Sequence, residues 1–407
     1  MDPHFVDRAG IRERPLRITV LTETYPPDIN GVARTVGMMV DAMLERGHEV
    51  QLVRPRQRSE PASPAHPSLR LHLVAGMPIP MYTDLRLGLV RGRSLQKAWR
   101  EWRPDLVHVV TEGPLGWVGV DAAKRLGIPV STDFHTNFHS YSRHYGFGLF
   151  AGIIAGYLRS LHNRADCTLV PTAEMKAGLE ALAFERVSVV GRGVDTRLFN
   201  PGRRSEALRA AWGCRKGETV VLHVGRLAPE KNLWLFVEAT DAMRGVAEVR
   251  VVLVGDGPQS AMLRARHPEF VFCGTRSGED LAAHYASADV FLFPSVTETF
   301  GNVTLEAMAS GLAVVAYDYA AARQHLRHWV SGLLAPTGET VEFIKMAALL
   351  ARSRDLRTRI AQGARSAAEA ISWEKTFDDL ESVLKRTTEA ARVETGAELP
   401  RTVHVET

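Results

Sequence analysis

PSVTETFGNVTLEAMASG, the stretch Pro294–Gly311, decides the fold of this chain. It places Glu298 and Glu306 eight positions apart around the step Gly301-Asn302, where the composition predicts that a helix begins. The first carboxylate then lies in a loop and the second about one turn into the helix. The helix N-terminus between them suits an anion, because its amides are unpaired and its dipole end is positive. Two acids beside a phosphate site would suit a ligand that carries sugar hydroxyls, a diphosphate and a ribose.

The residues before this stretch place it at the end of a strand. The apolar run ADVFLFPS, residues 288–295, predicts a buried strand that leads into the loop carrying Glu298. Ligands of open α/β sheets bind at such carboxyl ends of strands. The alternative is a surface acid followed by an ordinary amphipathic helix, since two glutamates at this spacing also occur by chance.

The whole chain alternates apolar runs with helical stretches. Strands rich in Val, Ile and Leu that alternate with helices predict parallel sheets covered on both faces. The expected strands are residues 16–23, 48–55, 69–76, 104–110, 128–135 and 165–172 in the first half, and 219–226, 249–256, 270–275, 289–295 and 312–318 in the second.

Two such series predict an α/β chain with two doubly wound parallel-sheet domains. We expect these domains to be residues 1–195 and 196–370, linked near the turn-rich segment Gly191–Pro201. A final helical stretch, residues 371–390, follows the second series, and residues 391–407 are expected to be a polar tail.

Composition and charge narrow the class of protein. Apolar residues make up 45% and charged residues 24% of the chain, which is typical of a globular protein. The net charge of +4 arises in the first half, and it is too small for a dedicated nucleic-acid binder but fits a surface that meets anionic lipid or phosphate. The three cysteines are far apart without zinc or redox spacing, which indicates a reducing cytoplasm. Met1–Pro15 is charged and lacks an apolar core, so we expect no signal peptide.

Three common ligand motifs are missing from the sequence. No G-x-G-x-x-G follows the first strand, which argues against a nicotinamide-binding domain, and no G-x-x-x-x-G-K-[ST] is present, which argues against a P-loop nucleotidase. No Asp-x-Asp occurs, which argues against a diphosphate chelated through a metal.

Two cations follow the first strand of the second half, in the stretch GRLAPEKN at residues 225–232. Arg226 and Lys231 leave the strand end and approach the next helix. Two cations fixed there could neutralise a diphosphate, and they would stabilise the charge that a departing nucleoside diphosphate gains. The alternative is a local charge pair with Glu230.

Glycines mark two other strand ends. Gly31 lies between the first strand and the first helix, where a ligand phosphate could approach the backbone closely. Gly255 and Gly257 end a strand of the second half and could admit a nucleotide. An ordinary tight turn is the alternative at both places.

Polar side chains of catalytic type end a strand of the first half, in DFHTNFH. His135 could bind a sugar hydroxyl, and Asp133 could orient or deprotonate an acceptor. The alternatives are a polar loop of hydrogen-bonded histidines, or a metal site formed by His135, His139 and His144, although the zinc motif H-E-x-x-H is absent.

Two segments bear on a membrane partner. Arg93, Lys97 and Arg100 share one face of a predicted helix, and such a basic amphipathic helix can lie on an anionic membrane or can simply be solvated. The apolar stretch Phe147–Leu158 is too short to span a bilayer, so it is either a buried helix or an interfacial element.

Taken together, these motifs resemble the retaining glycosyltransferases of family 4. The resemblance runs from about Leu16 to Lys385. The Glu298–Glu306 pair matches the E-x7-E motif of that family, and GRLAPEKN matches its Arg/Lys diphosphate motif. TYPPDINGVARTV and DFHTNFHSYSRHYG look most like the branch that contains sulfolipid synthases and glycolipid mannosyltransferases.

The resemblance implies a fold and a mechanism. It implies the GT-B fold, in which two Rossmann-like domains face a cleft and the helix at residues 371–390 crosses back to complete the first domain. It implies no metal and no cofactor apart from the nucleotide sugar itself. A donor phosphate oxygen would accept the acceptor's proton on the face from which the sugar departs, so that the transferred sugar retains its configuration.

The resemblance also implies a role for each matching position. Glu298, His135, Arg226 and Lys231 would form the catalytic set, with the two cations on the donor diphosphate and Glu298 facing the donor sugar. The other implied donor contacts are Glu306 on the ribose, Gly31 beneath the diphosphate, and the amides of Phe300, Gly301 and Asn302 near sugar and phosphate.

We therefore expect a cytoplasmic enzyme that associates with the inner face of the membrane. It would move a hexose from a UDP- or GDP-sugar to a hydroxyl acceptor, either a membrane lipid or a saccharide, and would not bind nucleic acid. The alternatives are a soluble transferase that makes a disaccharide or polysaccharide, a sugar-nucleotide binding module without turnover, and a GT-B epimerase.

Overall fold

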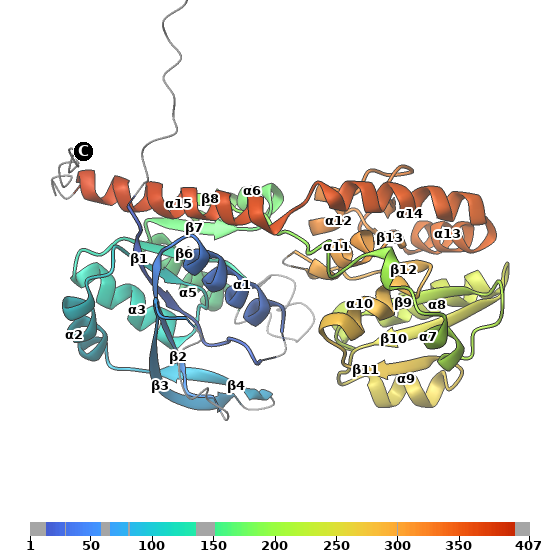
Figure 1. Ribbon diagram of the computed structural model, residues 1–407, viewed down its shortest axis with the longest axis horizontal. Helices are drawn as coiled ribbons and strands as arrows, with labels where there is room; N and C mark the ends of the chain where they lie inside the picture. The colour runs from blue at the N-terminus through green and yellow to red at the C-terminus, as the bar shows by residue number, and fades with distance from the viewer. Residues whose placement is uncertain are drawn as a thin grey trace, which may run out of the picture.

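Two α/β units lie side by side in the computed structural model (Figure 1). The structure describes residues 14–394 apart from residues 29, 58–65, 80–81, 136–150 and 299. The first unit is built on an eight-stranded sheet and the second on a six-stranded sheet. These sheets confirm the doubly wound α/β fold that the sequence predicts.

The first sheet is parallel except at one edge. β3 and β4 pair antiparallel, with Ala75 opposite Leu89. Strand order reverses beside β1, which pairs with β2 on one side and β5 on the other. Ligand sites of doubly wound sheets lie at such a reversal. In spatial order the strands are β4 (Tyr82–Leu89), β3 (Leu69–Ile79), β2 (Glu49–Pro55), β1 (Arg17–Leu21), β5 (Leu106–Val109), β6 (Val130–Asp133), β7 (Cys167–Val170) and β8 (Val187–Val189).

Helices cover both faces of this sheet, which explains why its strands are apolar throughout. Ile18 and Val20 of β1 pack toward α1 and α15, while Leu21 packs toward α2 and α3. The helices are α1 (Gly31–Glu45), α2 (Gly92–Trp102), α3 (Pro114–Arg125), α5 (Ala151–Asn163), α6 (Ala173–Ala181) and, from the end of the chain, α15 (Trp373–Glu394).

The second sheet is parallel throughout its described pairs. Val220 and Leu222 of its central strand pack on one face, against α10, α11 and α14, and Val221 packs on the other, against α8 and α13. In spatial order the strands are β11 (Val271–Gly274), β10 (Val249–Val254), β9 (Thr219–Val224), β12 (Val290–Phe293), β13 (Ala313–Tyr317) and β14 (Leu333–Ala335).

The helices of the second unit follow its strands along the chain. A 3₁₀ turn, η2 (Pro229–Lys231), precedes the first long one, and another, η1 (Pro201–Arg203), precedes the sheet. The helices are α7 (Glu206–Ala211), α8 (Leu233–Arg244), α9 (Ser260–Arg266), α10 (Gly278–Ala286), α11 (Asn302–Ala309), α12 (Ala320–His325), α13 (Thr340–Arg352) and α14 (Arg354–Glu369).

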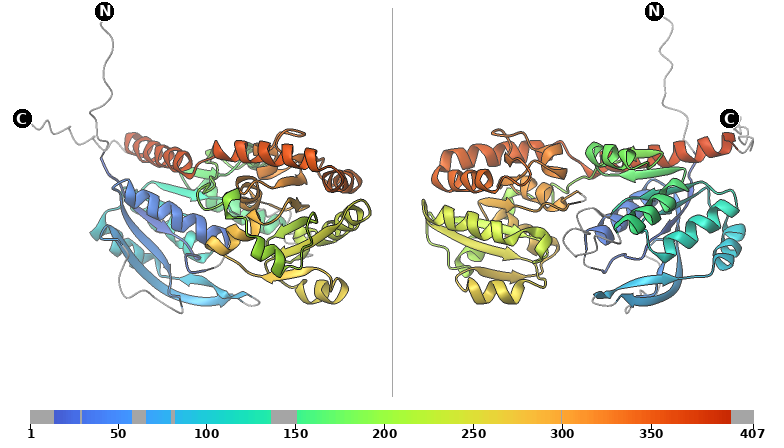
Figure 2. Two further views of the ribbon diagram at one scale, coloured as in Figure 1. Left: turned by 45° about the vertical axis from the view of Figure 1, so that its right-hand side comes forward. Right: turned by 180° about the vertical axis from the view of Figure 1, so that it is seen from behind.

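The last helix returns to the first unit, as Figure 2 shows from two sides. Phe377, Leu380 and Leu384 of α15 are buried in the core beneath α1. Arg46 beside α1 forms an ion pair with Asp378, at 2.7 Å. The helix runs to Glu394, so the first residues of the expected polar tail are helical, and residues 395–407 lie outside the described part.

The chain therefore crosses between the units twice, and the two crossings touch. The Val194 amide donates to the Ile371 carbonyl at 3.3 Å. A Cβ on Gly193 would lie 2.4 Å from the main-chain nitrogen of Trp373, so only glycine allows this approach.

We expect Gly193→Ala to destabilise the protein, because the new methyl group would meet backbone atoms that no side-chain rotation can move. Overpacking of this kind costs about 1–3 kcal/mol. Urea unfolding would measure the loss, with Gly191→Ala as the matched control, since a Cβ there approaches nothing closer than Gln324 at 3.9 Å. Equal unfolding midpoints for the two variants would contradict this account of the crossing.

Candidate active site

Lys231 and Glu298 meet at the carboxyl edge of the second sheet. Lys231 ends the turn η2 after β9, and Glu298 lies in the loop after β12. These strands are parallel neighbours, so their loops emerge at the same edge. The Lys231 ammonium and the Glu298 carboxylate form an ion pair, and both side chains are largely buried. The structure thus joins the two sequence motifs that were expected to share a ligand.

The Glu298 loop is fixed by several hydrogen bonds. The Ser295 hydroxyl donates to Glu298 Oε1 at 2.5 Å, and the Tyr319 hydroxyl donates to the Glu298 carbonyl at 2.8 Å. Ser295 and Thr297 also reach the Glu230 carbonyl in η2, at 3.3 and 3.4 Å. The acid is therefore held in one position before any ligand arrives.

Glycines let the neighbouring strand ends approach one another. A Cβ on Gly255 would lie 1.9 Å from the Gly225 carbonyl oxygen, and one on Gly257 would lie 2.6 Å from the Leu227 carbonyl oxygen. Close backbone packing therefore accounts for these two glycines. Gly225 itself has φ +147°, and a Cβ on it would lie 4.0 Å from Cε of Lys231.

Gly301 sets the start of α11. Its φ of +94° is a left-handed conformation, and it turns the chain from the Glu298 loop into the helix at Asn302, as the sequence predicts. Phe300 is buried and packs its ring against His325, with centroids 5.8 Å apart, so this ring belongs to the core.

Glu306 lies one turn into α11 and is buried between three elements. Its Oε1 accepts from Arg34 Nη1 of α1 at 2.6 Å, and its Oε2 accepts from the Tyr285 hydroxyl of α10 at 3.0 Å. Burial raises the pKa of Glu306, although the Arg34 guanidinium and the Tyr285 hydroxyl act in the opposite direction. Sequence reasoning missed both partners.

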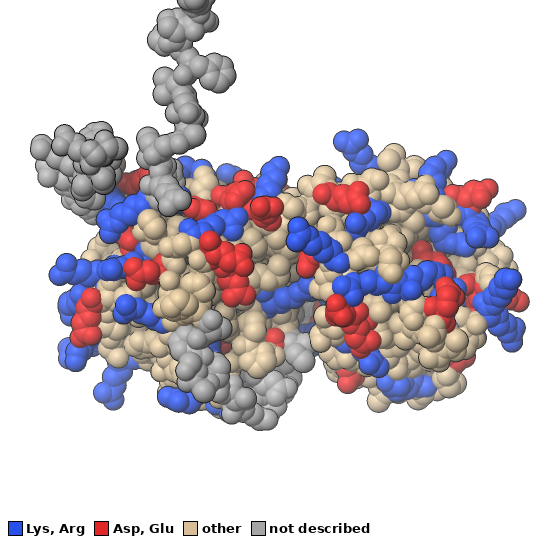
Figure 3. Space-filling model, in the orientation of Figure 1, with Lys and Arg blue, Asp and Glu red and all other residues tan. Residues whose placement is uncertain are grey.

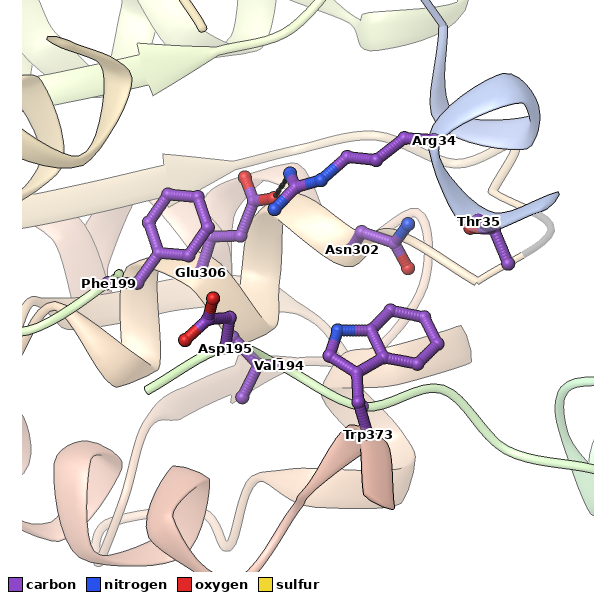
Figure 4. A pocket seen from close by; sticks show the side chains of 9 residues that line it. Arg34, Thr35, Val194, Asp195, Phe199, Asn302, Glu306 and Trp373 are labelled. Atoms are coloured by element: carbon purple, nitrogen blue, oxygen red, sulfur yellow. Dashed lines mark hydrogen bonds and ion pairs between the residues drawn. The ribbon is translucent and has the colours of Figure 1, made fainter. Parts of the chain in front are cut away.

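A pocket opens beside Glu306 where the two units meet (Figure 4). The Asn302 side chain points into it, and within the described residues its Oδ1 is buried without a hydrogen-bond partner. Both units contribute walls, so the pocket exists only while they are in contact. Its lining residues are Arg34, Thr35, Gly193, Val194, Asp195, Phe199, Asn302, Glu306 and Trp373.

Arg226 precedes Lys231 in the same segment after β9 and forms an ion pair there. Its Nη1 is 3.4 Å from Glu230 Oε1, so the structure contains the local charge pair that the sequence left open as the alternative. The Arg226 side chain is 43% exposed, which leaves the guanidinium accessible to a ligand that enters from solvent.

Asp133 and His135 lie at the carboxyl edge of the first sheet. His135 Nε2 is 3.1 Å from one carboxylate oxygen of Asp133, and the buried His108 of β5 is 3.6 Å from the other. Burial alone would raise the pKa of Asp133, but the His108 and His135 imidazoles hold it well below its usual range. A buried, ionised carboxylate between two imidazoles orients them and is poorly suited as a base. His139 and His144 lie outside the described residues.

Gly31 begins α1 and leaves open space at the helix start. The Asn30 side chain caps the helix by accepting from the Ala33 amide at 2.8 Å. Among the residues that the structure describes, a Cβ on Gly31 would meet no atom within 4 Å. Arg34 follows one turn later and touches Glu306, so this end of α1 faces the second unit.

The basic helix α2 is amphipathic, as the sequence predicts. Arg93, Lys97 and Arg100 are exposed, and Figure 3 shows Lys and Arg side chains, with acidic ones among them, projecting at the end of the molecule where α2 lies. The apolar face, formed by Leu95, Trp99 and Trp102, is buried in the protein. Only the basic face can therefore meet a membrane.

The apolar stretch that includes α5 is partly exposed to solvent. Residues 147–150 lie outside the description, and in the described part Leu158 is buried while Ile153 is 69% exposed. Tyr157 is also exposed, and its hydroxyl donates to the Glu112 carbonyl at 2.8 Å.

Two features of the described residues bear on partners. Among residues 14–394, with the stated gaps, no helix combines the length and apolarity that crossing a bilayer needs. In the same residues no group of three or more His, Cys, Asp and Glu side chains is arranged to hold a metal ion.

Two protein-family models match segments of the chain. Glycosyltransferase Family 4 matches residues 29–198, and Glycosyl transferases group 1 matches residues 218–353. Both matched segments carry the residues considered above: the first contains the Gly31 turn and Asp133-His135, and the second contains the Lys231 and Glu298 motifs.

Curated relatives cover between 74% and 92% of the chain. A GDP-mannose-dependent alpha-mannosyltransferase of Mycobacterium tuberculosis is 36% identical over 383 residues, which cover 92% of this chain and 99% of that protein. The sulfoquinovosyl transferase SQD2 of Arabidopsis thaliana is 30% identical, covering 88% of this chain and 71% of that protein. An alpha-monoglucosyldiacylglycerol synthase of Streptococcus pneumoniae is 25% identical, with coverage of 74% and 71%.

Solved structures agree on the fold. The sucrose-phosphate synthase of Thermosynechococcus elongatus superimposes with a TM-score of 0.75 at 17% identity, covering 92% of this chain and all of that one. The lipopolysaccharide glycosyltransferase WaaG superimposes with a TM-score of 0.67 at 17% identity and similar coverage, 93% and 100%. These superpositions confirm the GT-B architecture expected from the sequence.

We expect Lys231→Ala and Glu298→Ala each to lower the rate of sugar transfer by at least about 100-fold, as loss of one preorganised charge does at other active sites. The fold should persist, because both side chains lie at a strand edge and not in the core. Transfer from a nucleotide sugar would be measured beside the melting temperature, with exposed Lys345→Ala as control. Full activity in either folded variant would remove these roles.

Proposed function

The chain belongs to the retaining glycosyltransferases of family 4, with the GT-B fold, and we propose that it transfers mannose from GDP-mannose to a hydroxyl group of a membrane lipid without a metal ion. That it is a glycosyltransferase acting on a nucleotide sugar follows from its relatives. The donor base, the sugar, the lipid acceptor and the absence of a metal are the proposed parts.

The observation that carries the proposal is the ion pair between Lys231 and Glu298. A donor diphosphate would attract the Lys231 ammonium more strongly than one carboxylate does, since it carries more negative charge. Glu298 would then be released to accept hydrogen bonds from hydroxyls of the donor sugar, while Ser295 keeps it in place. The site is thus arranged for an exchange of partners when the donor binds.

The same arrangement would assist bond cleavage. The leaving diphosphate gains negative charge as the glycosidic bond breaks, and Lys231, Arg226 and the amides at the start of α11 would lie beside it. These groups supply the electrostatic stabilisation that a metal ion gives in other transferases. A donor phosphate oxygen would take the acceptor's proton, so no protein base is needed.

The first unit would hold the acceptor. His135 is oriented by Asp133, and its main-chain amide donates to Glu112 Oε1 at 3.2 Å. This fixed imidazole would lie beside the transferred sugar once the units close, and closure would exclude water that could otherwise hydrolyse the donor.

Relatives and surface features favour a lipid acceptor. Besides the mannosyltransferase, the relatives named above include a sulfoquinovosyl transferase and a glucosyldiacylglycerol synthase. The exposed basic face of α2 would attract anionic headgroups, and exposed Ile153 on α5 would add an apolar contact. Attachment by charge and one apolar contact would be reversible.

The donor assay is the direct test. We expect the purified protein to transfer label from GDP-[¹⁴C]mannose, and not from UDP-[¹⁴C]glucose, into an organic-soluble product when vesicles contain glycosylated diacylglycerol. EDTA should leave the rate unchanged. Label found only in water-soluble saccharide would replace the lipid proposal with the soluble alternative, and donor binding without turnover would leave only a binding module.

The role of α2 can be tested separately. We expect the triple variant Arg93→Ser, Lys97→Ser, Arg100→Ser to lose most of its co-sedimentation with phosphatidylglycerol vesicles, because each basic residue near the surface contributes about 1 kcal/mol. Its transfer to a short-chain acceptor in solution should be unchanged. The matched control removes exposed Lys216, Arg352 and Arg359 of the second unit. Equal vesicle binding by the two triple variants would refute a specific role for α2.

A further inference from the structure

Arg34 connects the two units at the point where a nucleotide is expected. It projects from α1 of the first unit, and its Nη1 lies 2.6 Å from Glu306 Oε1 on α11 of the second unit. Its guanidinium also lies over the Phe199 ring, 5.4 Å from the centroid. Figure 4 shows the guanidinium directed at Glu306 across the pocket. Both of these contacts lie on the second unit. They therefore hold the Arg34 side chain in one position only while the two units touch.

Glu306 is costly to keep charged where it lies. Its side chain is 8% exposed, and burial raises its pKa. The Tyr285 hydroxyl donates to it, and this phenol remains a donor because burial and the Glu306 carboxylate raise the pKa of Tyr285 well above its ordinary value. Tyr285 is neutral, so the cation that the structure places on Glu306 comes from the first unit.

Other charged groups near α11 have their own partners. Asp195 lines the same pocket, and its carboxylate accepts from the Arg197 and Leu198 amides. Arg365 of α14 donates to the Ala309 carbonyl at the far end of α11, at 2.6 Å. The Glu306 charge is therefore balanced across the boundary between the units and not within the second unit.

A carboxylate in this position can still accept two further hydrogen bonds. Each oxygen has one partner in the structure, and each retains a second lone pair. A protonated acid would offer fewer acceptor sites and would place a donor where a hydroxyl must donate. The buried Asn302 Oδ1, unpaired among the described residues, lies in the same pocket and adds another acceptor for a polar ligand.

We propose that Arg34 is a positioning residue which prepares Glu306 for the ribose hydroxyls of the donor only while the two units are in contact. The inference rests on the proposed function, in which Glu306 meets the ribose. When the units separate, Arg34 leaves with α1, and Glu306 keeps only Tyr285. Nucleotide binding then favours closure, and closure favours nucleotide binding by the same factor, since coupling between two equilibria is reciprocal.

Binding of GDP and UDP, measured by calorimetry between pH 6 and pH 8.5, tests the proposal without any transfer assay. We expect Arg34→Gln to raise the Kd of the preferred nucleotide about tenfold at pH 7. Without the guanidinium the pKa of Glu306 rises further, so the Kd of this variant should fall as pH increases, whereas the wild-type Kd changes less. Arg34→Lys should restore most of the affinity, and the added substitution Glu306→Gln should abolish the pH dependence.

The matched control is Arg323→Gln. Arg323 of α12 forms a second ion pair between the units, with Glu174 of α6 at 2.7 Å, but on the exposed rim. Its loss should loosen closure without making the Kd depend on pH. Melting temperatures would establish that each variant is folded.

The outcomes are distinct. An unchanged Kd in folded Arg34→Gln overturns the inference, and so does a loss of affinity that is the same at every pH. Tighter binding by this variant also overturns it, because Arg34 would then compete with the ribose for Glu306. If the wild type binds neither GDP nor UDP, the proposed function itself fails, and the inference fails with it.

Discussion

The ion pair between Lys231 and Glu298 exists because β9 and β12 are parallel neighbours. Their turns leave the sheet at one edge, so residues 67 positions apart in the chain meet there. The same constraint brings Asp133 at the end of β6 beside His108 of β5 in the first sheet. In both halves of the site, strand order determines which residues meet. The loops contribute the polar side chains.

Two buried acids show how surroundings decide the state of a carboxyl group. Asp133 has two imidazoles within 3.6 Å, and its pKa is held well below the usual range in spite of burial. Glu306 has one guanidinium and one phenol, and there burial prevails and the pKa is raised. The first acid has its partners inside one unit and serves as a fixed support. The second depends on a partner from the other unit, which makes it sensitive to their separation.

The sequence predicted the parts of the structure that depend on local pattern. Eleven apolar runs were expected as strands, and a strand lies at each, although β3 extends beyond its run to Ile79; the start of α11 at Gly301-Asn302 was also expected. β8 and β14 were not expected, because each is a three-residue edge strand. The antiparallel β4 was missed because it is paired through a hairpin and not through a helix. Arg34, Tyr285 and Tyr319 were missed as site residues since nothing near them in sequence marks their contacts.

The crossing of α15 to the first unit has a consequence for synthesis of the protein. Phe377, Leu380 and Leu384 belong to the core that includes α1, yet they follow every strand of the second unit in the chain. The second unit has all its strands and core helices by Glu369, so it can fold while the first still lacks its final helix. Until that helix is synthesised, the apolar side of α1 is uncovered in the nascent chain. During this interval a chaperone would have the largest exposed apolar surface to bind.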